Sequence, residues 1–129
     1  MADSKLCISE REVTERTDRG GTYRVMITPG SVNAKQLILG KATVPPGERV
    51  KAHVHDYSEE AFFVVQGTGC AILDGIGTVE FRAGDAVLVP KGVTHSIENR
   101  GSEEVVVVFA SAPLAPRPES GHRNLEKGS

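Results

Sequence analysis

The sequence predicts an all-β fold, a sandwich or barrel formed by one domain of 129 residues. Three observations support this prediction. About nine short apolar runs, several of them alternating with polar residues, follow one another between residues 22 and 110. Glycine, proline and asparagine turn signals separate these runs, and no segment has the sustained apolar spacing of an amphipathic helix.

The expected strands follow in order along the chain. The first three are 22–27, 35–44 with a kink at Gly40, and 49–55, separated by Pro29-Gly30 and Pro45-Pro46-Gly47. The strand 61–66 comes next, and then a hairpin of 70–73 and 77–81 turns at Asp74-Gly75, a favoured tight-turn pair. Three further strands are expected at 86–89, 94–99 and 105–110.

Both ends of the chain differ in composition from this strand-rich region, 22–112. Residues 1–21 are polar and charged, and we expect a mostly solvated N-terminal arm, part of which is free to pair with a neighbouring subunit. Residues 113–129 contain Pro113, Pro116 and Pro118, which forbid regular pairing. We expect this segment to be an irregular tail that lies over the mouth of the barrel.

The net charge and the apolar pattern of the chain exclude several classes of partner and location. The formal net charge is -2, and the Lys and Arg residues are scattered, so nucleic acid is not expected as a partner. The apolar run 105–110 is far shorter than the roughly 20 residues that a membrane helix needs. Residues 1–7 lack the pattern of a secretion signal, so we expect a cytoplasmic protein with Cys7 and Cys70 as reduced thiols.

Four residues predict a metal site. Alternate side chains of a strand share a face, so His53 and His55 project together, about 7 Å apart along the strand. A turn over 56–59 brings Glu60 back toward them, and antiparallel pairing places His95 opposite the first pair. Imidazole with one carboxylate suits a single divalent transition metal; zinc is favoured, with iron, manganese, nickel and copper as alternatives.

The order of these residues resembles the paired motifs of the cupin superfamily. The ten matching positions are Gly47, His53, His55, Glu60 and Gly67 in the first motif, and Gly84, Pro90, Gly92, His95 and Asn99 in the second. The resemblance implies a jelly-roll β-barrel with His53, His55, Glu60 and His95 as metal ligands. Flanking stretches at 24–29 and 113–122 are similar to those of small single-domain cupins of aromatic polyketide pathways, some described as polyketide cyclases.

Further residues are weaker candidates for the site. Strand alternation sets Arg49 on the face of the histidines, where it would bind substrate, and Phe62 either lines the pocket or belongs to the core. Tyr57 is a candidate proton donor, although surface packing explains it better. Alternation turns Glu59 toward solvent, and His122 in the tail is expected to be a solvent-exposed histidine rather than a fifth ligand.

The strand 61–66 is apolar on both faces. If Phe62 and Val64 face the interior, Phe63 and Val65 need cover from elsewhere. A second copy of the chain is the simplest source, and we therefore expect a homodimer.

The open metal site indicates an enzyme that acts on an oxygen-rich small molecule. By the resemblance, the reaction would be cyclisation of a polyketide, with the ion as Lewis acid and a ligand histidine, Tyr57 or water as proton carrier. Two alternatives stay open at this point. An Fe²⁺ site would support a dioxygenase, and a barrel that binds without turnover would be a small-ligand-binding module.

Overall fold

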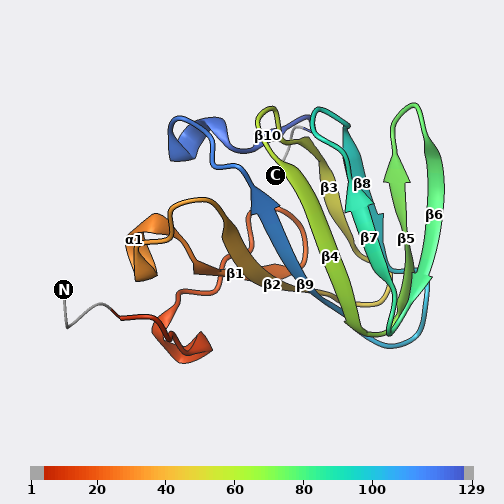
Figure 1. The fold of residues 1–129 in the computed structure, drawn as a ribbon. Helices are drawn as coiled ribbons and strands as arrows, with labels where there is room; N and C mark the ends of the chain where they lie inside the picture. The colour runs from red at the N-terminus through yellow and green to blue at the C-terminus, as the bar shows by residue number, and fades with distance from the viewer. Residues whose placement is uncertain (1–4, 127–129) are drawn as a thin grey trace.

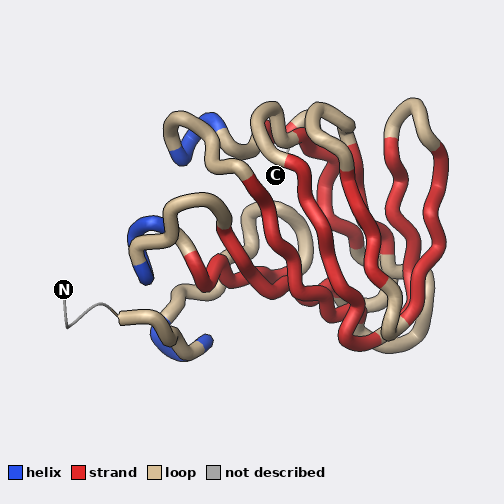
Figure 2. Tube along the Cα trace, viewed as in Figure 1, coloured by secondary structure: helices blue, strands red, loops and turns tan. Residues whose placement is uncertain are grey.

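The computed structural model describes residues 5–126, which form two five-stranded antiparallel sheets packed face to face (Figures 1 and 2). The first sheet has the order β1-β2-β9-β4-β7, and the second has the order β10-β3-β8-β5-β6. The strands are β1 Thr22–Ile27, β2 Ile38–Val44, β3 Arg49–Val54, β4 Glu59–Gln66, β5 Thr68–Leu73, β6 Gly77–Arg82, β7 Ala86–Val89, β8 His95–Glu98, β9 Val105–Ala112 and β10 Arg123–Asn124. This arrangement confirms the predicted all-β jelly roll.

Most expected strands are found within a few residues of their predicted bounds. β1 coincides with its prediction, and β5 and β6 form the expected hairpin around Gly75, which has φ +79°. Three short helices, η1 Glu10–Glu12, α1 Pro29–Val32 and η2 Pro118–Ser120, were not predicted. α1 forms because Thr28 caps it, accepting a hydrogen bond from the Ser31 N–H (3.0 Å), and Pro29 supplies a helical φ at its first position.

The core lies between the two sheets and is built by strand alternation. In β4, the side chains of Glu60, Phe62 and Val64 are buried, whereas those between them face outward. Phe62 is 1% exposed, and its ring packs edge-on against Phe81 with centroids 5.6 Å apart. Burial of such a side chain contributes roughly 2 kcal/mol or more, so the apolar face of β4 is a main source of the stability of the barrel.

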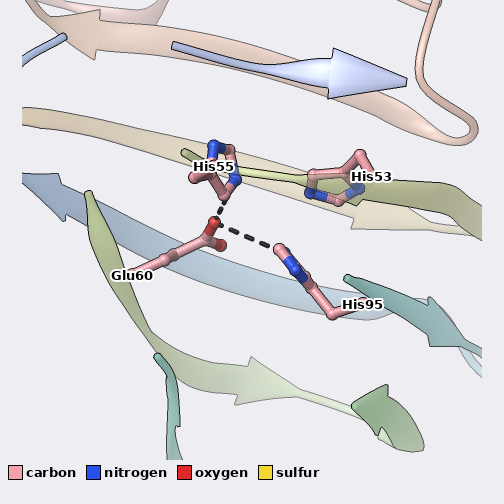
Figure 3. A group of neighbouring side chains, drawn as sticks. All are labelled: His53, His55, Glu60 and His95. Carbon is pink, nitrogen blue, oxygen red and sulfur yellow. Dashed lines mark ion pairs between the residues drawn. The ribbon is translucent and has the colours of Figure 1, made fainter. Parts of the chain in front are cut away.

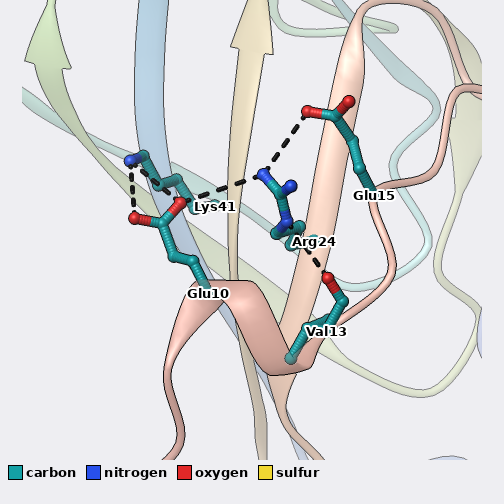
Figure 4. A network of polar contacts seen from close by, with 5 residues as sticks. All are labelled: Glu10, Val13, Glu15, Arg24 and Lys41. Carbon is teal, nitrogen blue, oxygen red and sulfur yellow. Dashed lines mark hydrogen bonds and ion pairs between the residues drawn. The ribbon is translucent and has the colours of Figure 1, made fainter.

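The N-terminal arm lies against the first sheet instead of extending freely into solvent (Figure 4). Arg24 of β1 donates from Nε to the carbonyl of Val13 (3.2 Å) and contacts Glu15 (3.4 Å). Lys41 of β2 contacts Glu10 (3.3 Å). Most of the described part of the arm, residues 5–21, is exposed, but these contacts fix its path along β1 and β2; residues 1–4 lie outside the described residues.

The C-terminal tail contains a short strand that the sequence did not predict. β10 follows the last proline of the tail, where regular pairing becomes available again, and it pairs with β3 through Arg123↔Val54 and Asn124↔His53. Arg123 also forms an ion pair with Asp56 (3.0 Å). The tail therefore runs along the strand that carries the first histidine, and its last residues, 127–129, lie outside the described part of the chain.

Within residues 5–126, no helix has the length and the apolar character that crossing a bilayer requires.

Gly67→Ala should cost more stability than Gly75→Ala. Both glycines have positive φ (+90° and +79°), so alanine strains the backbone similarly at each, by about 1–2 kcal/mol. A Cβ at Gly67 would lie 2.4 Å from the Glu104 carbonyl oxygen, whereas one at Gly75 meets nothing within 4 Å. We expect Gly67→Ala to lower the unfolding free energy in urea by about 2 kcal/mol more than Gly75→Ala; equal losses would contradict the close approach.

Candidate metal centre

Four side chains converge inside one end of the barrel (Figure 3). His53 lies on β3, His55 just after it, Glu60 on β4 and His95 on β8. His53 and His95 are direct neighbours in the antiparallel β3–β8 register, and β4 brings Glu60 from the opposite sheet. One ligand atom from each residue lies within 4.8 Å of all the others, so the cluster is compact enough to surround a single ion.

Backbone carbonyls fix the tautomer of all three histidines. Nδ1 of His53 lies 2.7 Å from the Lys51 carbonyl oxygen, Nδ1 of His95 lies 2.9 Å from that of Val93, and Nδ1 of His55 lies 2.8 Å from that of Gly121. A carbonyl can only accept, so each Nδ1 carries the proton in the neutral ring. Each Nε2 then has a free lone pair, the state that a metal ligand requires.

The free nitrogen atoms have no adequate partner in the protein. Nε2 of His55 and of His95 are buried and have no hydrogen-bond partner within the described chain. Oε1 of Glu60 lies 2.8 Å from Nε2 of His55 and 3.7 Å from Nε2 of His95 (Figure 3), so a neutral ring turns a lone pair toward the carboxylate at both contacts. Buried acceptors left in this way are costly, and a bound cation would satisfy both nitrogens and the carboxylate at once. The cluster thus has the composition and geometry to hold a metal.

The electrostatics keep Glu60 ionised. Burial opposes the charge of Glu60, but in the metal-free protein a proton held on the neighbouring imidazole nitrogens, chiefly Nε2 of His55, outweighs burial and keeps the pKa of Glu60 well below the ordinary range; a bound cation would take the place of that proton. Burial, and then the neighbouring His95, lower the pKa of His53 to about 3, so this ring is neutral at pH 7. For His55, burial lowers the pKa, but the paired Glu60 reverses the effect and raises it.

A cavity opens from this cluster into the barrel. Its walls are largely apolar, and three further polar side chains face it: Arg19, Tyr23 and Ser111. Sequence reasoning missed all three. Ser111 is placed opposite Glu60 by the β4–β9 register, which the sequence does not reveal, and Arg19 belongs to the arm and has no periodic pattern around it. The lining residues are Arg19, Gly20, Tyr23, Ile38, Ala42, Val50, His53, His55, Glu60, Ile97, Val107, Phe109 and Ser111.

The expected orientation of Arg49 toward the histidines is wrong. β3 has a register irregularity between Val50 and His53, so strict alternation breaks there and Val50 faces the cavity with His53. Arg49 turns outward and pairs with Glu126 instead.

The other weak candidates also lie away from the cavity. Phe62 belongs to the core and does not line the cavity, and the Tyr57 side chain is 44% exposed on the surface. Glu59 is exposed, as alternation predicted.

His122 is not the solvent-exposed histidine that we expected. Its ring stacks on His53, with centroids 4.4 Å apart and planes 20° apart, because β10 pairs with β3 directly beyond it. Its Nε2 contacts Oδ1 of Asn124 (2.7 Å), and its Nδ1 is buried without a hydrogen-bond partner in the described chain. The tail therefore covers one side of the His₃Glu cluster.

These features define a class of protein: a single jelly-roll barrel with a buried His₃Glu cluster at the end of an interior cavity. Comparison with known proteins places the chain within that class. The cupin domain family matches residues 40–111, which include all four clustered residues, and the chain belongs to this family.

Relatives and solved structures agree with this assignment. The chain is 39% identical over 119 residues to the polyketide synthase CurC of Streptomyces cyaneus, covering 92% of this chain and 77% of that protein. The polyketide cyclase RemF of Streptomyces resistomycificus superposes with TM-score 0.73 at 19% identity, over 97% of this chain and 88% of RemF. Oxalate decarboxylase of Bacillus subtilis, described with Mn(II) centres, superposes with TM-score 0.78 at 21% identity, over 89% of this chain and 30% of that chain.

His122 should make the metal-free protein sensitive to acid. Burial, and then the charge of Arg19, lower the pKa of His122 from its ordinary 6.5 to about 4. Between these two pH values the unfolded chain binds a proton that the folded chain does not, so stability falls as the pH falls. In His122→Gln, we expect the loss of unfolding free energy between pH 7 and 4.5 to be about 1–2 kcal/mol smaller than in wild type, after allowance for partial exposure.

The measurement is urea unfolding of both metal-free proteins at each pH. Between pH 7 and 8 the two proteins should change in parallel, which serves as the control. Parallel change down to pH 4.5 as well would show that His122 does not carry the effect.

Proposed function

We propose that this cupin is a metal-dependent enzyme that cyclises a polyketide or a related oxygen-rich small molecule. One observation carries the proposal: three histidines with their Nδ1 atoms held by backbone carbonyls direct their remaining nitrogens, with Glu60, toward a common point at the end of an apolar cavity. The similarity to CurC and the fold shared with RemF support the substrate class.

His53, His55, Glu60 and His95 would hold one divalent ion, for which zinc is our first expectation and iron, manganese, nickel and copper are alternatives. When bound, such an ion supplies a Lewis acid that polarises a carbonyl oxygen and makes the neighbouring C–H groups more acidic. Four protein ligands leave room for substrate oxygen if the ion is five- or six-coordinate. The cavity reaches the cluster at His53, His55 and Glu60, so a substrate in the cavity would lie beside these residues.

The chain itself would position the substrate and exclude water. Ile38, Val107 and Phe109 form apolar walls opposite the histidines, and such walls hold a flexible carbon chain folded and dry. Tyr57 lies outside this cavity, and the ligand histidines have Nδ1 committed to backbone carbonyls and Nε2 to the ion, so a water molecule is the better candidate for the proton carrier.

The alternative hypothesis, a dioxygenase, requires the same four ligands, because imidazole and carboxylate bind iron and manganese as well as zinc. Oxygen consumption during turnover would separate a dioxygenase from a cyclase. Tight binding of polyketide analogues without any turnover would favour a ligand-binding module over both. Cytoplasmic location and the lack of a nucleic-acid partner stay predictions from the sequence.

Glu60→Gln should lose the metal while leaving the barrel folded. The variant keeps the size of the side chain but removes the negative charge that offsets the ion, and His95→Ala should act in the same way by removing one ligand. We expect elemental mass spectrometry of untagged protein to find about one ion per chain in wild type and at least tenfold less in either variant.

Glu59→Gln is the matched control, because the neighbouring carboxylate is exposed and outside the cluster. Full metal content in Glu60→Gln with unchanged circular dichroism would contradict the proposed centre.

We also propose that a second copy of this chain covers the outer apolar face, defined as Ala61, Phe63, Val65, Ala86 and Leu88 on β4 and β7. Phe63, Val65 and Leu88 are 49%, 52% and 56% exposed, and no member of this face is charged. The members lie side by side in the sheet, through the pairs Phe63↔Ala86 and Ala61↔Leu88. A two-fold dimer brings such a face against itself and removes it from water.

Phe63→Gln should shift the protein from dimer to monomer at micromolar concentration, because a polar amide would have to be buried in an apolar contact. Sedimentation velocity measures the change. Ile76→Gln is the control, because Ile76 is 59% exposed but lies in the β5–β6 turn, away from the outer apolar face. A monomeric wild-type protein, or the same shift in both variants, would overturn the assignment of this face.

A further inference from the structure

Arg19 places a positive charge at the cavity, and the proposed reaction assigns it no role. Its side chain lines the cavity together with His53, His55 and Glu60, although it comes from the N-terminal arm. Within residues 5–126, its guanidinium forms no ion pair, whereas the neighbouring Arg16 pairs with Asp18 (3.2 Å).

The arm is built to hold Arg19 at this position. The Arg19 carbonyl accepts a hydrogen bond from the Lys51 N–H (2.9 Å), which ties the arm to β3 beside the metal cluster. Gly20 (φ +91°) allows this approach, since a Cβ there would lie 2.1 Å from the Arg49 carbonyl oxygen. The guanidinium lies over the buried ring of Tyr23, 4.8 Å from its centroid.

The carboxylates near Arg19 are already engaged. Asp18 accepts a hydrogen bond from the Tyr23 hydroxyl (2.8 Å) and contacts Arg16. Glu60 belongs to the histidine cluster. Burial lowers the pKa of Arg19, yet an arginine stays charged at pH 7, so the cavity contains a partly desolvated cation without its own counter-ion.

With a metal bound, the cluster would also carry a net positive charge, as Arg19 does. A divalent ion with one carboxylate and neutral imidazoles leaves about one positive charge, and Arg19 adds another on the same cavity. An apolar cavity with this excess of positive charge favours an anion over a neutral molecule of the same shape.

We infer that Arg19 binds an anionic oxygen of the substrate, a carboxylate or an ionised 1,3-dicarbonyl, and so orients the substrate relative to the metal cluster. This inference rests on the proposed function for the location of the site but not for the reaction. A guanidinium recognises a carboxylate through two parallel hydrogen bonds, which fixes direction as well as charge. Arg19 would therefore select acidic substrates over neutral ones.

The test compares two small probes that have the same shape and differ in charge, malonate and malonamide. Isothermal titration of zinc-loaded wild-type protein should show tighter binding of malonate. In Arg19→Gln, we expect malonate affinity to fall about 10- to 100-fold, the loss of a charge-assisted contact, while malonamide affinity changes less than about threefold. Arg16→Gln is the matched control, because it removes an arginine of the same arm that does not line the cavity.

Metal content before and after titration shows whether any loss comes from Arg19 or from release of the ion. Unchanged malonate affinity in Arg19→Gln at full metal content, equal losses for both probes, or a wild-type preference for malonamide would each overturn the inference. The result does not depend on turnover. A protein that prefers malonate through Arg19 but cyclises no polyketide would contradict the proposed function alone.

Discussion

The site depends on keeping one carboxylate charged inside an apolar barrel. Glu60 lies on the same face of β4 as Phe62 and Val64, so the alternation that builds the core also buries an ionised group. Such burial is costly unless opposite charge or strong donors compensate it. As neutral rings the three histidines do not meet this demand, because their Nδ1 protons are committed to backbone carbonyls and their Nε2 atoms bring lone pairs; without a metal, the charge of Glu60 depends on a proton held at Nε2 of His55. The protein thus presents a negative group among acceptors, an arrangement that a cation completes.

The sequence alone predicted the positions of those side chains that motif spacing or strand alternation determines. The motif spacing predicted that His53, His55, Glu60 and His95 meet, and alternation in β4 correctly assigned its inward and outward residues. Prediction failed at Arg49, because strand alternation holds only while the register is regular and the irregularity of β3 leaves no sign in the residue pattern.

Arg19 and His122 were missed for a different reason. Neither lies in a periodic segment, and each reaches the site through pairing with a strand distant in sequence. The arm and the tail are polar, and their composition indicates solvent exposure on average. Only tertiary contacts show that Arg19 and His122 turn inward, so a single sequence contains no local signal for either residue.

The inner part of the N-terminal arm and the C-terminal tail both attach to the irregular part of β3. Lys51 and Ala52 fall between its paired positions with β8, so their backbone groups need other partners. The Lys51 N–H donates to the Arg19 carbonyl, and the Ala52 N–H donates to the Glu126 carboxylate (2.6 Å). The irregularity that turns Arg49 away from the cavity therefore also provides the attachment points that bring Arg19 and the tail to it. It follows that the ligands and the residues that reach them from the ends of the fold are specified by different stretches of sequence. The ligands come from the motifs on β3, β4 and β8, whereas Arg19 and His122 come from the arm and the tail that attach to β3.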